Sequence, residues 1–212
     1  MKLIKNTQDL LTSLKLDGKS NLPIRNFQID SRKVTKNSVF FGLTGSNEDG
    51  SLYAEDALNK GASLAIIKES KIVDSSARPS KIILVKSPEK CLIESAKVAM
   101  GRYKGNIIGV TGSNGKTTTK NILKNCIKSS YATFQNYNNE IGLPLCALEL
   151  DSKNSTAIFE MGAAKSGDID ILSKIIKPNI GIITYIGHSH LDGLNSVRGV
   201  LEVKSELIRN IK

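Results

Sequence analysis

Residues 109–119 (GVTGSNGKTTT) carry the residue types that bind the phosphates of a nucleotide. They join a short apolar run, residues 106–111, to residues 116–128, whose apolar side chains recur at helical spacing. The backbone N–H groups of such a turn and the positive end of the helix dipole point at one place, where they attract phosphate oxygens. Lys116 can reach the β- and γ-phosphate oxygens, and the Thr117 hydroxyl can bind Mg²⁺.

The spacing of this turn departs from the common G-x-x-x-x-G-K-(S/T) pattern, because Val110 stands five positions before Gly115. A Gly/Asn turn that only caps an ordinary helix is the alternative. The sequence Gly-Lys-Thr-Thr at the junction of a strand and a helix favours the phosphate site. The residues of the turn that we expect to contact the nucleotide are Gly112, Ser113, Asn114, Gly115, Lys116, Thr117 and Thr118.

One apolar run and one loop carry further groups that could bind a metal ion. Glu160 stands near the end of the apolar run 156–161, and a carboxylate at the carboxyl end of a strand beside a phosphate turn suits Mg²⁺. The alternative is a strand-end glutamate that faces solvent. His188 and His190, the only histidines, follow the apolar run 180–186. At least one of them can face the phosphates and a cation, whereas the other is expected on the surface, because no cysteine or third histidine stands nearby.

Other candidate residues have an ordinary interpretation beside a functional one. Lys204, read alone, is a solvated lysine on a predicted helix. Residues 136–145 (NYNNEIGLPL) form a polar run that ends in an apolar turn, and the asparagines favour a loop. Arg32, in an Asp-Ser-Arg sequence after a strand, and the loop 45–51 could hold a diphosphate or a carboxylate, or could serve ordinary turn chemistry.

The elements that must position these residues fall into two segments, with the boundary at residues 103 and 104. Residues 1–103 indicate a small α/β domain, with strands expected at 24–29, 39–43, 63–67 and 81–85 and helices at 7–14, 52–60 and 88–103, the first capped by Thr7. Residues 104–212 repeat a strand followed by a helix, with strands at 106–111, 156–161 and 179–185 and helices at 116–128, 167–176 and 194–211.

This alternation predicts an α/β fold. In residues 104–212 it indicates a P-loop parallel sheet with helices on both faces and a ligand crevice at the carboxyl ends of the strands. Three strand–helix units are few for a nucleotide-binding sheet, so we expect this second domain to be incomplete.

The composition argues against several classes of protein. The net charge of +10 comes mostly from lysine, 24 of 30 basic residues, spread along a chain with 5% aromatic residues, so we expect no nucleic-acid partner. Cys91, Cys126 and Cys146 lie too far apart for a zinc site or a disulfide framework, and we interpret them as reduced, mostly buried thiols. No signal peptide and no run of about 18 apolar residues is visible. We therefore expect a cytoplasmic monomer without membrane insertion.

Taken in order along the chain, these motifs resemble those of the Mur ligase family, the ATP-dependent enzymes that extend the peptide of bacterial cell-wall precursors. Residues 111–120 (TGSNGKTTTK) resemble the family's ATP loop. Residues 159–163 (FEMGA) with 167–169 (GDI) resemble its E-(L/M)-G-A…G-(E/D)-I stretch. Residues 136–145 resemble the N-x-N-N-(D/E)-I-G-x-P segment of the branch that uses D-alanyl-D-alanine.

Two further matches lie near the end of the chain. Residues 187–193 (GHSHLDG) resemble G-x-x-H-L-(E/D)-G, which assigns the family's metal-site histidine to His190 rather than His188. Lys204, in Lys-Ser-Glu-Leu, matches the lysine of a K-G-E-(I/L) motif. In this family CO₂ carbamylates that lysine, which then binds metal as a carboxylate would.

The resemblance implies a role for each matched residue. The residues implied in catalysis are Lys116, His190 and Lys204. Those implied in binding Mg²⁺ are Thr117, Glu160, His190 and carbamylated Lys204. Asn138 and Asn139 would join the turn residues in binding ATP, and the residues near the UDP end of the precursor would be Ser31, Arg32, Asn47, Asp49 and Ser51. Ser51 departs from the family pattern, because many relatives have histidine there.

The reaction that the resemblance implies is an amide-bond ligation in peptidoglycan synthesis. The carboxylate of UDP-N-acetylmuramoyl-tripeptide would attack the γ-phosphorus of ATP, and the amine of D-alanyl-D-alanine would then attack the acyl phosphate. The family has a third, C-terminal domain to which nothing in residues 1–212 corresponds. We therefore expect this chain alone to be inactive.

Three alternatives keep part of these motifs. They are another Mur-type ligase, a different P-loop enzyme such as a kinase or a folylpolyglutamate-type ligase, and a non-catalytic module that binds a nucleotide or a UDP-sugar. Residues 136–145 and the Asp-Ser-Arg sequence argue against a different P-loop enzyme. Substrate-dependent phosphate release would distinguish such an enzyme from a Mur ligase. Binding without turnover would identify the module.

Overall fold

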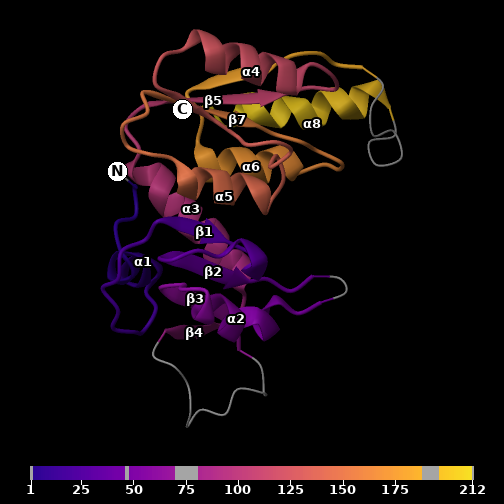
Figure 1. Ribbon diagram of the computed structural model, residues 1–212. Helices are drawn as coiled ribbons and strands as arrows, with labels where there is room; N and C mark the ends of the chain where they lie inside the picture. Colours follow the sequence, from indigo (N-terminus) through magenta and orange to yellow (C-terminus); the bar gives the residue numbers. More distant parts are fainter. Residues whose placement is uncertain (1, 46–47, 70–80, 188–195, 212) are drawn as a thin grey trace. The chain divides into compact units, whose positions relative to one another are not determined.

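The chain divides into two compact units, Met1–Ala99 and Met100–Lys212 (Figure 1). The computed structural model describes residues 2–45, 48–69, 81–187 and 196–211. Among these residues each unit contains one four-stranded sheet, and every strand pair is parallel. The predicted α/β fold with parallel sheets is confirmed.

The first unit is built on a sheet with the strand order β1-β2-β3-β4. Its strands are β1 (Asn26–Gln28), β2 (Ser38–Gly42), β3 (Leu64–Lys68) and β4 (Ile82–Val85). Its helices are α1 (Thr7–Leu14), α2 (Ala54–Asn59) and most of α3 (Pro88–Arg102), with 3₁₀ turns η1 (Ser31–Lys33) and η2 (Gly50–Tyr53). All of β2 is buried, because a parallel strand in the middle of a sheet is covered on both faces.

The second unit has the strand order β6-β7-β5-β8. Its strands are β5 (Asn106–Thr111), β6 (Ser130–Ala132), β7 (Thr156–Glu160) and β8 (Ile180–Ile183). Its helices are α4 (Lys116–Cys126), α5 (Gly142–Glu149), α6 (Asp168–Ile176) and α8 (Val197–Arg209). β5 pairs with β7 on one side and β8 on the other, so the turn that follows β5 emerges at the middle of the sheet.

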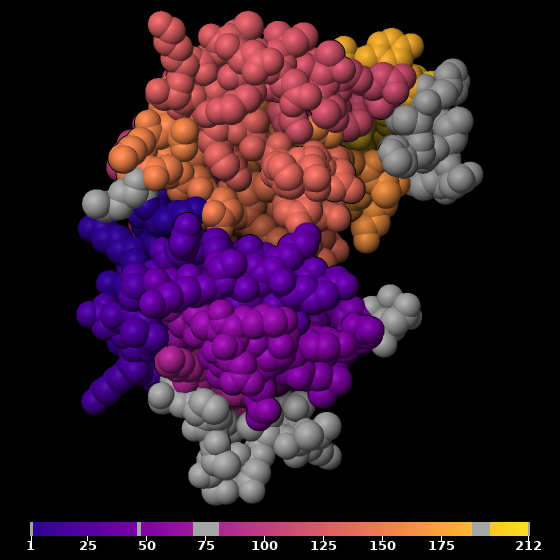
Figure 2. All heavy atoms as spheres, in the orientation of Figure 1, coloured from indigo at the N-terminus to yellow at the C-terminus, as the bar shows by residue number. Residues whose placement is uncertain are grey.

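Helices cover both faces of this second sheet, as predicted. Ile108, Val110 and Ile158 face α4 and pack against its Leu123. Figure 1 shows α4 on one side of the strands and α5, α6 and α8 on the other. The outer side chains of α4, such as Ile122, are exposed, and in Figure 2 the rose-coloured α4 atoms lie on the surface.

A pair of glycines lets α8 approach the opposite face of the sheet. Gly109 of β5 and Gly181 of β8 are register partners, so their missing side chains leave a shallow groove across two neighbouring strands. Leu207 of α8 fills it, because a Cβ at Gly109 would lie 3.0 Å from Leu207 Cδ1 and one at Gly181 would lie 3.1 Å from Leu207 Cγ. The glycines therefore fix the distance between α8 and the sheet.

The sequence patterns miss two elements of the second unit. β6 has only three residues and a polar first residue, too short to show an alternating pattern. α5 is buried from Gly142 to Leu148, so it lacks the polar face that identifies most surface helices, and the predicted apolar turn is wrong. Pro144 fits because it lies in the first turn of α5. The described sheet consequently has four strands instead of the predicted three.

Smaller predictions are also corrected. Asn6, not Thr7, caps α1, because its side chain accepts a hydrogen bond from Asp9 N at 2.7 Å. α4 ends at Cys126 rather than residue 128. Of the three cysteines only Cys146 is buried, and Cys126 is exposed. No helix in the described part of the chain is long and apolar enough to cross a membrane.

We expect Gly109→Ala to lower the free energy of unfolding by about 1–3 kcal/mol, because overpacking strains a filled core. The new Cβ would lie 2.6 Å from Met161 Cε as well as close to Leu207. Gly101→Ala in α3 is the control, since a Cβ there meets nothing within 4 Å, and it should stabilise by about 0.5–1 kcal/mol. Urea titration followed by circular dichroism measures both. Equal stability of Gly109→Ala and wild type would contradict the tight groove.

Candidate functional site

The glycine turn between β5 and α4 has the backbone of a phosphate-binding loop. Gly112 and Gly115 have φ values of +147° and +80°, conformations that a side chain would strain. At Gly112 a side chain would also collide with the Thr184 hydroxyl. Gly115 is the N-cap of α4 and has no side chain to cap the first N–H groups of the helix, which therefore remain available to an anion.

Residues after β8 hold this turn in place. Ser113 N donates to Tyr185 O at 2.8 Å, and the Ser113 hydroxyl and Gly187 N lie 3.0 Å apart. The Thr184 hydroxyl lies 2.5 Å from Asn114 O. Sequence reasoning missed Thr184, although its position at the carboxyl end of the strand beside β5 is a usable signal.

Lys116 lies over the turn that it was predicted to serve. Its Nζ donates to Gly112 O at 2.7 Å, so the ammonium is held above the backbone that would receive phosphates. Lys116 is half-buried, whereas Asn114, Thr117 and Thr118 are exposed. The turn thus carries one positive charge and several exposed side chains that can donate hydrogen bonds.

Glu160, at the end of β7, is buried beneath the turn. Its carboxyl oxygen Oε2 accepts a hydrogen bond from the Thr117 hydroxyl at 2.9 Å, and Oε1 accepts one from Asn138 Nδ2 at 3.1 Å. The side chain is 3% exposed, so the alternative of a solvent-facing glutamate is wrong. The structure brings together Thr117, Asn138 and Glu160, which stand far apart in the sequence.

Lys120 is a member of this group that sequence reasoning missed. Its Nζ lies 3.5 Å from Glu160 Oε2, and both side chains are 3% exposed. Lys120 follows Lys116 by four residues and Thr117 by three, so helical spacing places it on the face of α4 that carries those two. That spacing is the signal that could have identified it.

Lys204 is buried, not solvated as its sequence alone suggests. It is 1% exposed on α8, whose inner face carries Val200, Val203 and Leu207. Burial, with a smaller effect from the positive charge of Lys116, lowers the pKa of Lys204 to about 8, although Asp168 and Glu206 act in the other direction. A buried lysine with a lowered pKa suggests a functional site.

Glu206 ties α8 to the start of α6. Its two carboxyl oxygens accept hydrogen bonds from Gly167 N at 2.8 Å and Asp170 N at 2.9 Å. Gly167 is the N-cap of α6 and supplies no side-chain cap, so a residue from another helix fulfils that role. This contact fixes α8, and Lys204 with it, against α6.

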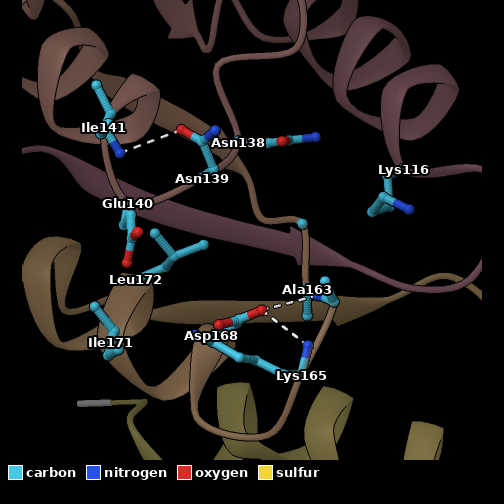
Figure 3. Close-up of a pocket in the computed structure, with 12 residues that line it drawn as sticks. Lys116, Asn138, Asn139, Glu140, Ile141, Ala163, Lys165, Asp168, Ile171 and Leu172 are labelled. Atoms are coloured by element: carbon cyan, nitrogen blue, oxygen red, sulfur yellow. Dashed lines mark hydrogen bonds between the residues drawn. The ribbon is translucent and has the colours of Figure 1, made fainter. Parts of the chain in front are cut away.

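A pocket of about 430 Å³ lies between Lys116, the loop that precedes α5 and the loop that follows β7 (Figure 3). Asp168 shapes one wall, because its carboxylate accepts hydrogen bonds from Ala164 N at 2.8 Å and Lys165 N at 3.0 Å. Asn139 shapes another, because its side-chain oxygen accepts a hydrogen bond from Gly142 N at 2.8 Å at the start of α5. Asn138 and Asn139, both predicted to bind ATP, line this pocket.

The predicted residues of the first unit are engaged in local bonds. Arg32 is exposed and forms a two-bond pair with Asp30, at 2.9 and 3.0 Å, which holds the pKa of Asp30 below its usual range. Ser31 is buried. Asp49 accepts a hydrogen bond from Ser51 N at 2.9 Å, and the Ser51 hydroxyl accepts one from Lys68 N at 3.1 Å.

Three predicted site residues cannot be located. His188, His190 and Asn47 lie outside the described residues. Within the described ranges no group of three or more histidine, cysteine, aspartate or glutamate residues could hold a metal ion. Thr117 and Glu160 nevertheless place two oxygen atoms 2.9 Å apart at the turn, and oxygen atoms are the ligands that Mg²⁺ prefers.

Comparison with protein families matches both units. The Mur ligase middle domain matches residues 110–212, and the catalytic domain of the Mur ligase family matches residues 23–103. The UDP-N-acetylmuramoyl-tripeptide–D-alanyl-D-alanine ligase of Buchnera aphidicola is 35% identical over 216 residues, covering 100% of this chain and 46% of that protein. The Bacillus subtilis ligase of the same name is 36% identical over 186 residues, covering 86% of this chain and 40% of that protein.

Solved structures agree with these matches. MurF from Acinetobacter baumannii has a TM-score of 0.86 and 28% identity, covering 98% of this chain and 47% of its own. MurF ligase from Thermotoga maritima, in complex with ADP, has a TM-score of 0.77 and 34% identity, covering 89% of this chain and 44% of its own. The chain therefore spans less than half the length of these relatives.

Replacing Lys204 should change how stability depends on pH. The folded pKa of about 8 lies below the usual 10.5, so the unfolded chain binds more protons between these values and stability rises with pH through that window. Lys204→Met removes the cost of the buried charge and should be more stable than wild type by roughly 3 kcal/mol at pH 7. The difference should shrink by about 2 kcal/mol at pH 9.5.

Urea titrations of both proteins at pH 7.0, 8.0 and 9.5 measure this difference. Lys174→Met is the control, because Lys174 is exposed and pairs with Asp170 on the surface, where ion pairs contribute about 0–1 kcal/mol. A pH-independent difference between Lys204→Met and wild type would contradict the lowered pKa.

Proposed function

Because the chain belongs to the Mur ligase family, we propose that it is the precursor- and nucleotide-binding part of an ATP-dependent amide-bond ligase. The reaction is the addition of D-alanyl-D-alanine to UDP-N-acetylmuramoyl-tripeptide in peptidoglycan synthesis, carried out by a cytoplasmic monomer. The observation that supports it most is the cluster of Thr117, Asn138 and Glu160 beneath the glycine turn. The relatives from Buchnera aphidicola and Bacillus subtilis described above carry the name of that ligase.

The turn residues bind the phosphates of ATP. The positive end of α4 and the N–H groups at Gly115 and after it attract the β- and γ-phosphate oxygens. Lys116, now bonded to Gly112 O, exchanges this neutral acceptor for a charged phosphate oxygen. The exchange strengthens the interaction, because the ammonium then faces an anionic oxygen instead of a neutral carbonyl oxygen.

Mg²⁺ fits the oxygen atoms beside the turn. Thr117 and Glu160 would hold it together with His190 and carbamylated Lys204. When bound, the ion reduces the repulsion between the phosphates and the attacking carboxylate. Asn138 keeps Glu160 in place through Oε1, so that the other carboxyl oxygen remains directed toward Thr117.

Lys204 is suited to carbamylation because it is buried and its pKa is lowered to about 8. The neutral amine is the form that adds CO₂, and near pH 8 a large fraction of Lys204 is neutral. In carbamylation the amine nitrogen forms a bond to the carbon of CO₂ and releases a proton, which leaves an anionic side chain with two oxygen atoms. Glu206, through its bonds to α6, holds the helix that carries it.

The remaining sites receive the two organic substrates. The pocket beside Lys116 and Asn138 offers the carboxylate of the tripeptide a place next to the terminal phosphate. In the first unit, Ser31, Arg32, Asp49 and Ser51, with Asn47, contact the UDP end. Arg32 can bind a diphosphate in place of Asp30, because both are bidentate acceptors.

Lys116→Ala should weaken ADP binding about 10- to 100-fold, because it removes a charge-assisted contact worth about 1.5–3 kcal/mol. Isothermal titration calorimetry with ADP and Mg²⁺ measures the affinity. Lys128→Ala is the control, since Lys128 is exposed beyond the end of α4 and should leave the affinity unchanged. A folded Lys116→Ala protein with wild-type affinity would refute the nucleotide site.

The ligase assay tests the whole proposal. ATP, Mg²⁺, bicarbonate, UDP-N-acetylmuramoyl-tripeptide and D-alanyl-D-alanine are supplied, and the pentapeptide product is sought by mass spectrometry. Since the chain spans less than half of its relatives, we expect little product from these 212 residues alone and efficient product when the remaining part of a relative is added in trans.

Two outcomes would argue against this function. Product from a different amine under the same conditions would indicate another Mur-type ligase. Nucleotide binding without product, even when the remaining part is present, would indicate a non-catalytic module.

A further inference from the structure

Lys120 is a buried cation to which the proposed reaction gives no role. Its side chain is 3% exposed and lies one helical turn beyond Lys116 on α4. Burying a charge is costly unless it is paired. The carboxylate that pairs with Lys120 is Glu160, at 3.5 Å. The pairing of these two buried groups suggests that Lys120 arranges its partner.

Lys120 connects three segments that meet at Glu160. Its Nζ lies 3.5 Å from Glu160 Oε2 and donates to Gln135 O at 3.4 Å. Glu160 N in turn donates to the Thr133 hydroxyl at 3.0 Å. The ammonium therefore joins α4, the end of β7 and the segment between β6 and α5.

The two oxygens of Glu160 have different partners. Oε2 faces α4, where Thr117 donates at 2.9 Å and Lys120 supplies the positive charge. Oε1 faces Asn138 at 3.1 Å. Removing Lys120 would leave a buried carboxylate whose remaining side-chain partners among the described residues, a hydroxyl and an amide, are both neutral.

We propose that Lys120 is a positioning residue that holds the Glu160 carboxylate in the orientation in which it binds the metal ion of the nucleotide complex. This inference rests on the proposed function. Lys120 is only 3% exposed, so a nucleotide in the turn would not contact it. It would act through Glu160 alone, whereas the half-buried Lys116 bonds to the turn itself.

Two other roles for Lys120 give different results. If Lys120 only supported the local fold, its loss would weaken nucleotide binding equally with and without metal. If its charge only repelled the incoming cation, its loss would strengthen metal binding. Positioning predicts a loss that appears only when metal is present.

The experiment measures how strongly Mg²⁺ and ADP assist each other's binding. ADP affinity is measured by calorimetry once in Mg²⁺ and once in EDTA, and the ratio of the two dissociation constants gives the coupling. Lys120→Met should reduce this ratio by about 10- to 100-fold, the usual effect of losing a group that orients a metal ligand. The affinity in EDTA should stay within about twofold of wild type.

Glu160→Gln and the Lys120→Met, Glu160→Gln double variant complete a double-mutant cycle. Glu160→Gln should reduce the coupling by a similar factor. Lys120→Met combined with Glu160→Gln should reduce it no further than Glu160→Gln alone, because Lys120 acts only through that carboxylate. Additive losses would overturn the proposal.

Two controls separate positioning from damage to the fold. Lys124→Met changes the next lysine on α4, which is exposed, and should leave the coupling unchanged. Lys120→Arg keeps the charge and should retain most of the coupling. If Lys120→Met does not fold, the double variant, in which both groups are neutral, is compared with Glu160→Gln for ADP affinity in EDTA. Weaker binding by the double variant would show that Lys120 acts other than through Glu160, and would overturn the proposal.

The outcomes also distinguish this inference from the proposed function. Wild-type protein that binds no ADP would overturn the proposed function and this inference with it. Wild-type protein whose ADP binding depends on Mg²⁺, with an unchanged or larger coupling in Lys120→Met, would overturn the role of Lys120 alone.

Discussion

A carboxylate buried under the glycine turn must be compensated, and much of the second unit depends on how Glu160 meets this requirement. β7 delivers the group to the carboxyl end of the sheet, and α4 supplies Thr117 and Lys120 from two positions on one helical face. The segment before α5 supplies Asn138. Since these partners come from the helix and the loop while the carboxylate itself comes from the strand, the carboxylate can be satisfied only when all three elements are in their native places.

On the opposite face of the sheet, α8 carries a lysine, Lys204, into the interior. A helix can carry a buried lysine only if its apolar neighbours are well packed. Gly109 and Gly181 allow this by admitting Leu207 into the groove that crosses two neighbouring strands. The same helix reaches α6 through Glu206. The two faces of the sheet thus contribute different groups. One face carries the Glu160 carboxylate with its partners, and the other carries the buried amine of Lys204.

The sequence predicts well those elements whose residues interact locally. The turn, β5 and α6 follow from glycines and from helical or apolar spacing, and the predicted bounds of β5 agree with the structure. The sequence predicts poorly those elements and site residues whose environment depends on tertiary burial. α5 lacks a polar face, and Lys204 resembles a surface lysine until α8 is packed against its neighbours. Lys120 was missed for the same reason, because its partner Glu160 stands 40 residues away.

The contact between Glu206 and the start of α6 has a thermodynamic consequence. A helix whose first N–H groups are capped by its own residues can fray and recover alone, whereas α6 depends on a carboxylate from α8. Opening α8 therefore uncaps α6 and releases the loop that Asp168 closes. These parts form one cooperative unit, whose amides should share a single opening free energy in hydrogen exchange. The wall of the pocket and the buried amine are thus present together or lost together.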